Sequence, residues 1–262
     1  MTTRGAESEV AGSAESLEAP TVAAAVLVRN LRKDYGHHEA LRGVDLRLDP
    51  GTFLTIFGPN GAGKTTFMKV LSTLTRPTEG IVHVGGKDVV KDAPEVRKRV
   101  GVISHNTYLY AQLTGLENLE FYAGMYRVPN GRQRALSLLK RMDLFTRMDD
   151  RVGGYSRGMQ QRLSVARALL HDPELLLLDE PYTGLDQHAS RVLAEVLQGL
   201  RDGTRTVIMT THNIQEGLSG CDRVAILVEG QFVYDRRVAD IDTSSFQHTY
   251  FTCVHEELPE ED

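Results

Sequence analysis

The sequence predicts an α/β fold with a mainly parallel sheet, a small antiparallel β subdomain and an inserted helical subdomain. Short β-rich runs alternate with stretches of helical periodicity along most of the chain, which is the pattern of an α/β core. Leu175–Leu178 is a continuous apolar run, typical of a strand buried on both faces of a parallel sheet. The stretch at about 108–158 is helical, so we expect it to be an insertion. A chain of 262 residues suits one or two domains.

The first hundred residues are predicted to hold several strands and one helix. Phe53–Phe57 is a β-rich run, and a helical stretch follows it after a glycine-rich loop. Ile81–Val84, followed by two glycines, is typical of a strand and a turn in a small antiparallel sheet with the region around residues 26–55. The helix is indicated by four apolar residues that share one face: Phe67, Val70, Leu71 and Leu74.

Three helices are predicted between Thr114 and about Leu170. Thr114 and Glu117 have the spacing of a capping box, which marks the start of the first helix. Each helix is indicated by apolar residues at helical spacing, which are Leu116, Leu119, Tyr122 (or Ala123) and Tyr126 in the first, Ala135, Leu138, Leu139 and Met142 in the second, and Met159, Leu163, Ala166 and Leu170 in the third.

The alternation of strands and helices returns in the last third of the chain. The buried run Leu175–Leu178 is followed by a helical stretch over about 192–200. Two further apolar runs, Thr206–Thr210 and Val224–Val228, are predicted as strands. These strands complete the mainly parallel sheet, because helices connect them to the strands before.

The net charge of −5 is distributed unevenly along the chain. Residues 1–24 carry −3 and residues 255–262 carry −5, which leaves +3 on the body at 25–254. We therefore expect a disordered N-terminal tail and an acidic C-terminal tail around one domain. A nearly neutral body gives no charge argument for nucleic acid as a partner. No segment approaches the ~18 apolar residues of a membrane helix, and the N-terminus lacks the apolar core of a secretory signal.

A glycine-rich loop follows the predicted strand Phe53–Phe57. Its sequence matches G-x-x-x-x-G-K-[ST] between a strand and a helix, which is the context that a phosphate-binding loop requires. Backbone N–H groups of such a loop surround phosphate oxygens, Lys64 would reach the β- and γ-phosphates, and the Thr65 hydroxyl would hold Mg²⁺. The loop predicts a P-loop NTPase (RecA-like) core that binds a nucleotide through Gly58, Pro59, Asn60, Gly61, Ala62, Gly63, Lys64, Thr65 and Thr66.

Two carboxylates end the buried strand Leu175–Leu178. Asp179 is placed to complete the shell of Mg²⁺ through a water molecule. Glu180 is placed to polarise the attacking water beside the γ-phosphate as a general base. Together with the phosphate loop, this pair predicts a nucleotide hydrolase.

The segment Tyr155–Arg162 narrows the class of hydrolase. Here the chain resembles the ATP-binding cassette (ABC) family, whose signature is usually Leu-Ser-Gly-Gly-Gln followed by a helix. Ser156 and Gly158 match that signature, and three neighbours depart from it: Tyr155, Arg157 and Met159. The resemblance covers about residues 26–235. It implies that the signature residues Ser156, Gly158 and Met159 face the ATP of a partner subunit.

The same resemblance implies roles for four more residues. Tyr35 looks like the aromatic residue that stacks on adenine, and His212 looks like the switch histidine at the end of a strand. Asp186 looks like the aspartate of the family's D-loop. His105 stands where the family usually has a glutamine in the Q-loop. Two interpretations stay open: its neutral ring takes the role of that amide, which is our hypothesis, or the glutamine is dispensable and His105 is a polar surface residue.

The resemblance also implies how the chain works. In this family two cassettes pair head to tail around two MgATP, so a homo- or heterodimer of cassettes is expected. A chain without a membrane span needs a separate integral membrane permease, which implies a peripheral position on the cytoplasmic face of the cell membrane. Residues Gly101–His105 and Leu113–Leu119 look most like single-cassette exporter subunits. Some of these, of heme-exporter type, serve cytochrome c maturation.

Two other function classes stay open from the sequence. One is a soluble ABC ATPase in iron–sulfur assembly or another non-transport role. The second is a regulatory nucleotide-binding subunit without turnover, against which the presence of both Glu180 and His212 argues.

Overall fold

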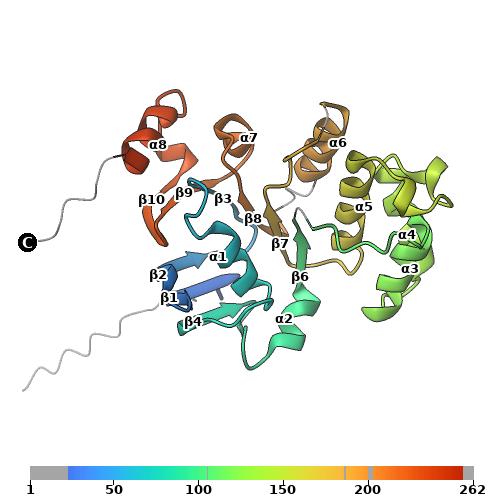
Figure 1. Cartoon of the computed structure of the whole chain (residues 1–262), viewed down its shortest axis with the longest axis horizontal. Coiled ribbons are helices and arrows are strands. Elements are labelled where there is room, and N and C mark those ends of the chain that lie inside the picture. Colours follow the sequence, from blue (N-terminus) through green and yellow to red (C-terminus); the bar gives the residue numbers. More distant parts are fainter. Residues whose placement is uncertain (1–22, 105, 186, 200–202, 256–262) are drawn as a thin grey trace, which may run out of the picture.

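A computed structural model describes residues 23–104, 106–185, 187–199 and 203–255 (Figure 1). A six-stranded sheet forms the centre, with the strand order β10-β9-β3-β8-β7-β6. Five strands run parallel and β10 pairs antiparallel with β9. In sheet order the strands are Gln231–Arg237 (β10), Arg223–Val228 (β9), Phe53–Phe57 (β3), Thr206–Thr210 (β8), Leu175–Asp179 (β7) and Val100–Ile103 (β6).

A second, antiparallel sheet has the order β2-β1-β4-β5. Its strands are His38–Leu48 (β2), Val26–Tyr35 (β1), Glu79–Val84 (β4) and Lys87–Asp88 (β5). Helix α1, Lys64–Leu71, lies between the two sheets, and its Phe67 belongs to a cluster of buried apolar residues drawn from both of them. The small antiparallel subdomain expected from the sequence is thus present.

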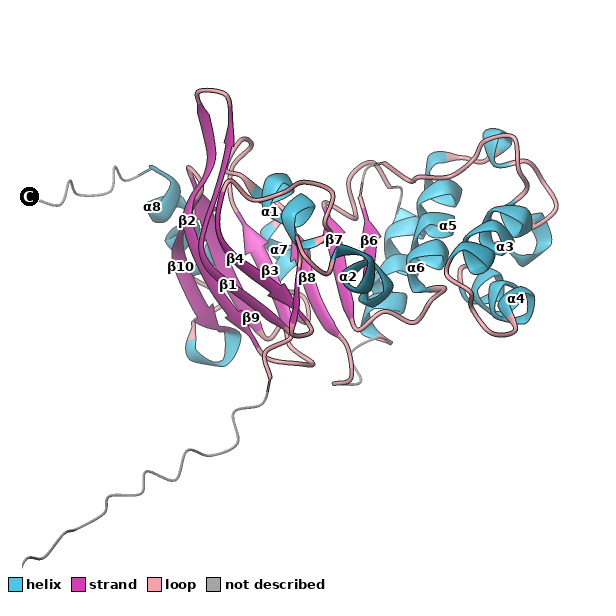
Figure 2. Cartoon of the chain, turned by 90° about the horizontal axis from the view of Figure 1, so that it is seen from below, coloured by secondary structure: helices cyan, strands magenta, loops and turns pink. Residues whose placement is uncertain are grey.

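The helical block lies at the β6 edge of the central sheet (Figures 1 and 2). It contains α3 (Gly115–Met125), α4 (Gly131–Arg141), two short 3₁₀ turns (Phe145–Arg147 and Val152–Gly154) and α5 (Arg157–Leu169). Thr114 caps α3 with the predicted capping box: its side chain accepts from the Glu117 N–H, and the Glu117 carboxylate accepts from the Thr114 N–H. The chain's remaining helices are α2 (Ala93–Arg99), α6 (Gln187–Gln198), α7 (Ile214–Leu218), a 3₁₀ turn (Val238–Asp240) and α8 (Phe246–His255).

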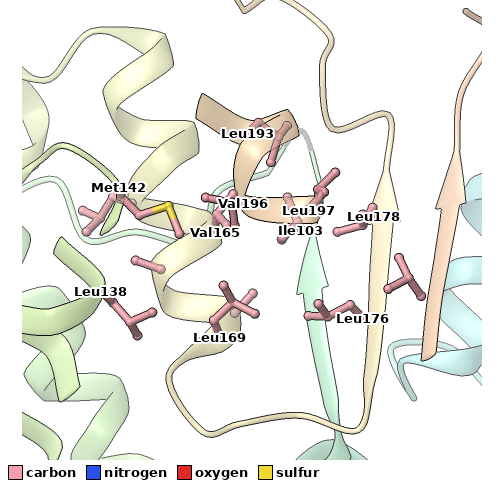
Figure 3. Close-up of a cluster of buried hydrophobic side chains, with 14 of the residues drawn as sticks. Ile103, Leu138, Met142, Val165, Leu169, Leu176, Leu178, Leu193, Val196 and Leu197 are labelled. Carbon is pink, nitrogen blue, oxygen red and sulfur yellow. The ribbon is translucent and has the colours of Figure 1, made fainter. Parts of the chain in front are cut away.

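A second apolar cluster joins the helical block to the central sheet. Figure 3 shows side chains of α4, α5 and α6 meeting those of β6 and β7. Leu176 and Leu178 of β7 and Ile103 of β6 are fully buried in it. Every residue of β7 is buried, as expected for a strand covered on both faces. Across the described residues, we find no helix with the length and apolar character that a membrane crossing requires.

Two expectations about the first hundred residues were wrong. The helix α1 ends at Leu71, because Ser72 donates its hydroxyl to the Met68 carbonyl (2.8 Å) and Thr73 adopts a left-handed conformation (φ 62°). Leu74, expected on the buried face of this helix, is 57% exposed. The strand Phe53–Phe57 lies in the central sheet between two parallel neighbours, so the antiparallel sheet takes only residues 26–48 of this region.

The C-terminal helix α8 was not predicted, and it covers the end of β3. Phe246 is 1% exposed, and its ring centroid lies 5.2 Å from that of Phe57. Phe57 is the last residue of β3 and directly precedes the phosphate loop. The apolar residues Phe246, Tyr250, Cys253 and Val254 have helical spacing and pack against the core, so this periodicity was present in the sequence and was missed.

Replacing Phe246 with alanine is expected to lower the free energy of unfolding by about 3–5 kcal/mol, because the change leaves a cavity against Phe57. Phe251 on the same helix is 47% exposed, and Phe251→Ala is expected to change it by less than about 0.5 kcal/mol. Urea unfolding followed by circular dichroism measures both values. Equal midpoints for the two variants would contradict the packing of α8 on β3.

Candidate functional site

The loop between β3 and α1 is shaped by its glycines. Gly58, Gly61 and Gly63 have positive φ angles of 156°, 85° and 102°. A Cβ atom on Gly58 would lie 2.2 Å from the Leu227 carbonyl oxygen, and one on Gly63 would lie 2.4 Å from that of Ala40. The back of the loop is therefore packed on β9 and β2 and accepts only glycine. A Cβ on Gly61 would meet nothing within 4 Å, so this residue faces open space.

Lys64, the first residue of α1, lies under this loop. Its side chain is 7% exposed, and the ammonium donates to the carbonyls of Gly58 and Pro59. Burial lowers the pKa of Lys64, whereas the negative charges of Glu180 and Asp179 act in the opposite direction. The Glu180 carboxylate lies 3.9 Å from the Lys64 ammonium. Lys64 therefore links the phosphate loop to the acidic end of β7.

The carboxyl ends of the neighbouring strands β7 and β8 place the two acidic residues. Asp179 is 5% exposed, and its carboxylate accepts a hydrogen bond of 2.7 Å from the Thr210 hydroxyl. Glu180 follows with a left-handed backbone (φ 51°), and its N–H donates to the Thr210 carbonyl (3.1 Å). This strained turn points the Glu180 side chain away from the strand, so the two adjacent carboxylates occupy different places.

His212 completes the group at the end of β8. Its Nδ1 lies 2.9 Å from a carboxylate oxygen of Glu180, and its side chain is 63% exposed. The following Asn213 caps α7 by accepting from the N–H groups of Gln215 and Glu216, which holds the histidine segment at the strand end. The three predicted catalytic residues therefore lie together: Lys64, Glu180 and His212.

Tyr35, the residue predicted to stack on adenine, lines a pocket together with the phosphate loop and Glu180. This pocket of about 290 Å³ is lined by Tyr35, by residues 59–66 of the loop and α1, and by Glu180. Tyr35 is 47% exposed, and the Lys33 ammonium lies 4.8 Å from its ring centroid. Two further lining residues, His38 and Ala40, were not predicted from the sequence. Tyr35 pairs with His38 at the β1–β2 turn, and this pairing places His38 and the nearby Ala40 at the pocket.

The chemistry of these side chains fits a nucleotide with Mg²⁺. The Lys64 ammonium and the first N–H groups of α1 are donors of the kind that phosphate oxygens accept from. The Thr65 hydroxyl and the Asp179 carboxylate are oxygen ligands, which Mg²⁺ prefers. Thr65 lines the pocket with Thr66, and Asp179 lies at the strand end beside Lys64.

The predicted signature residues lie at the start of α5. Ser156 caps the helix, and its side-chain oxygen accepts a hydrogen bond of 3.2 Å from the Met159 N–H. Tyr155, which departs from the family pattern, is 5% exposed and donates its hydroxyl to the Arg147 carbonyl at 2.6 Å. Arg157 lies against Gly184, where a Cβ would come 2.5 Å from the guanidinium carbon. The departures are therefore accommodated without disturbing the helix cap.

The signature residues do not line the pocket of Tyr35 and the phosphate loop. A separate hollow of about 330 Å³ begins at Arg157 and reaches Glu180 and Thr183. The two hollows share Glu180, and neither is lined by the signature residues Ser156, Gly158 or Met159. His105 and Asp186 lie outside the described residues, so their roles stay predictions.

Comparison with protein families and curated proteins gives consistent matches. A family described as "ABC transporter" matches residues 41–183, and one described as "AAA domain, putative AbiEii toxin, Type IV TA system" matches residues 151–219. The chain is 38% identical to the ABC transporter ATP-binding protein NatA of Bacillus subtilis, over 75% of this chain and 81% of that protein. It is 40% identical to the daunorubicin resistance ATP-binding protein DrrA3 of Streptomyces coeruleorubidus, over 80% and 67% of the two chains.

Solved structures show the same fold. The ATP-binding cassette MJ0796, a dimer in a post-hydrolysis state bound to ADP and Pi, matches with a TM-score of 0.74 and 30% identity. That match covers 81% of this chain and 98% of MJ0796. An ATP-binding subunit of an ABC transporter matches with a TM-score of 0.77 and 27% identity, over 86% and 93% of the two chains. The chain therefore belongs to the ABC transporter family as an ATP-binding cassette, the part of these transporters that binds and hydrolyses ATP.

Proposed function

We propose that this chain is the ATP-hydrolysing subunit of an ABC exporter, acting as a dimer of cassettes on a separate membrane permease. The observation that carries the proposal is the meeting of Lys64, Glu180 and His212 beside the phosphate-loop pocket, with Ser156 outside it. Such a site holds the reacting phosphate on one side only. A second cassette supplies the other side.

The residues of this pocket bind and orient ATP. Tyr35 stacks on adenine, while the loop N–H groups and the Lys64 ammonium hold the phosphates. Thr65 and Asp179 are the residues that would hold Mg²⁺, and the ion would neutralise negative charge on the phosphate oxygens. The buried hydrogen bond from Thr210 keeps the Asp179 carboxylate in its orientation.

Glu180 acts as the general base. Its carboxylate accepts a proton from the water that attacks the γ-phosphorus, as the bond from that phosphorus to the bridging oxygen breaks and ADP leaves. His212, in contact with this carboxylate at 2.9 Å, orients it. The Lys64 ammonium on its other side stabilises the ionised carboxylate.

Ser156 and Gly158 serve the ATP held by the partner subunit. The Ser156 oxygen already accepts from the Met159 N–H, which leaves its O–H proton to donate to a γ-phosphate oxygen. Ser156 is exposed at a helix start, where the helix dipole favours an anion. Hydrolysis removes the group that joins the two subunits, so the dimer opens and drives the permease.

An exposed group of side chains on the helical block offers a docking surface for the permease. This aromatic patch consists of Tyr108, Tyr110, Phe121 and Met125, which are 46%, 45%, 46% and 57% exposed. The rings of Tyr110 and Phe121 lie 5.0 Å apart. Apolar side chains that gather on a surface in this way mark interaction sites. We infer that the permease docks here and thereby holds the chain at the cytoplasmic face of the membrane.

Replacing Phe121 with aspartate is expected to lower the membrane-bound fraction of the chain about tenfold, because a charge in an apolar contact costs at least about 1.4 kcal/mol. The measurement is quantitative blotting of washed membranes and supernatant from cells that express the chain with its genomic neighbours. Phe251→Asp on α8, which Figure 1 shows at the opposite end of the molecule, is the matched control. Equal membrane-bound fractions for the two variants would contradict docking at the aromatic patch.

The direction of transport is proposed from the relatives. Two of them are named for daunorubicin resistance and for Nod factor export, and both descriptions fit removal of a compound from the cell. The relatives are transporter subunits, so a soluble non-transport ATPase is not favoured. A heme-exporter role in cytochrome c maturation stays a prediction. Identification of the membrane protein that copurifies with the chain tests the assignment of a permease.

A further inference from the structure

The outer edge of the central sheet contacts α5, and the segment that follows α5, at three consecutive residues. Strand β6 is the last strand of the sheet, so no strand among the described residues pairs with its outer carbonyls. Arg167 donates to the Val102 carbonyl at 2.7 Å, and Nε2 of His171 donates to the Val100 carbonyl at 3.1 Å. Between them, a Cβ on Gly101 would lie 2.6 Å from a carbonyl oxygen of α5, so the two backbones approach closely.

Arg167 is a buried cation in an aromatic setting. Its side chain is 8% exposed, and its guanidinium lies 5.6 Å and 5.4 Å from the ring centroids of Tyr108 and Tyr122. Its Nε has no hydrogen-bond partner among the described residues, and none of their carboxylates forms an ion pair with it. A buried charge without a carboxylate contributes little to stability, because desolvation is only partly offset by the rings. Its value to the protein must lie in the contact that it makes.

His171 reinforces the same contact from the segment after α5. Its ring stacks on that of Tyr126 at 4.1 Å and 6°, at the end of α3. The Tyr122 hydroxyl on α3 donates to the Tyr108 carbonyl, in the segment that follows β6. The C-terminal end of α5 is thus fixed to β6 and to α3, while its N-terminal end carries Ser156 at the surface.

We propose that Arg167, reinforced by His171, is a positioning residue that sets the tilt of α5 on β6 and thereby places Ser156 against the ATP of the partner subunit. Ser156 and Arg167 lie about 17 Å apart along the helix. A tilt of about 10° at the fastened end moves Ser156 by about 3 Å, and misplacement of about 1 Å already lowers a rate about 10²-fold. The proposal rests on the shared-site dimer, so the defect of an Arg167 variant must appear in the partner's site.

Two mixed dimers separate an effect in the partner's site from an effect in the chain's own site. Arg167→Met removes the hydrogen bond and the charge. In the first mixture, Arg167→Met is combined with an excess of Lys64→Ala. The working site then pairs the phosphate loop of the Arg167→Met subunit with the intact signature of the Lys64→Ala subunit. We expect this mixture to have the ATPase rate of wild type mixed with Lys64→Ala. In the second mixture, Arg167→Met is combined with an excess of Ser156→Arg. The working site then pairs the phosphate loop of the Ser156→Arg subunit with the signature of the Arg167→Met subunit. There we expect a rate at least about tenfold below that of wild type mixed with Ser156→Arg.

Control variants keep the test decisive. Arg167→Lys retains a donor and a charge, and it is expected to recover most of the rate in the second mixture. If Arg167→Met does not fold, as judged by thermal unfolding, His171→Leu carries the test with the same asymmetry. The positioning role would be overturned if Arg167→Met matched the wild-type control in both mixtures. It would also be overturned if the rate fell by the same factor in both mixtures. Absence of activity in Ser156→Arg mixed with Lys64→Ala would instead overturn the shared-site dimer itself.

Discussion

Replacing Glu180 with glutamine is expected to lower the ATPase rate by about 10²–10⁴-fold while ATP binding is retained. The amide keeps the size of the carboxylate but cannot accept a proton from the attacking water. The contacts proposed to bind the nucleotide come from residues 59–66, which line the pocket with Tyr35, and the substitution leaves these residues unchanged. The variant should therefore accumulate as an ATP-bound dimer.

The measurement combines steady-state phosphate release with size-exclusion chromatography in ATP and Mg²⁺. Glu174→Gln is the matched control, because Glu174 lies just before β7, at the opposite end of the same strand, and its side chain is 62% exposed. It is expected to keep wild-type turnover and to remain in the wild-type monomer–dimer distribution. Turnover of Glu180→Gln at the wild-type rate would remove Glu180 from the role of general base.

Replacing Lys64 with alanine is expected to weaken ATP binding by about 1.5–3 kcal/mol, which is about ten- to a hundredfold in Kd. In the proposed complex the ammonium makes charge-assisted contacts to phosphate, and alanine has no donor to replace them. The substitution also removes the hydrogen bonds that the Lys64 ammonium makes to the Gly58 and Pro59 carbonyls within the loop. The first loss acts on the bound state of the nucleotide, whereas the second acts on the loop of the free protein as well.

Calorimetric titration with ATP in the presence of Mg²⁺ measures this loss. Lys69→Ala provides the control, since Lys69 lies on the same helix with an exposed side chain and does not line the pocket. Its Kd is expected to equal that of wild type. An unchanged Kd for Lys64→Ala, with the control also unchanged, would mean that the lysine acts elsewhere than on the phosphates.

The contiguous parts of the site could be predicted from the sequence. The phosphate loop is a run of neighbouring residues, and its function follows from glycine flexibility, one lysine and two hydroxyls. The capping box of Thr114 and Glu117 was likewise predicted, because both of its hydrogen bonds join residues three positions apart. The role of Glu180 was predicted from its place after the buried strand, whereas that of His212, 32 positions away, needed the resemblance to a family. Their contact depends on β7 and β8 being neighbours in the sheet.

Other features escaped prediction because their signal is not local. The helix α1 ends before Leu74 through a side-chain bond to the helix and a left-handed residue, neither of which the spacing of apolar residues reveals. His38 enters the nucleotide pocket only because a hairpin places it opposite Tyr35. The contact of Arg167 with β6 joins residues that are 65 positions apart in the sequence. In the sequence, Arg167 looks like an ordinary surface arginine on a helix.

The fold class, the phosphate loop and the acidic end of the buried strand follow from the sequence alone. These features depend on short-range pattern, since backbone conformation and apolar periodicity are set by residues a few positions apart. Only the tertiary structure decided how Glu180 meets Lys64 and His212, and how α5 is fastened to the sheet edge. Strand order and helix packing bring such residues together through burial of apolar area. Because this driving force is non-directional, the local sequence does not show which distant segments will pack against each other.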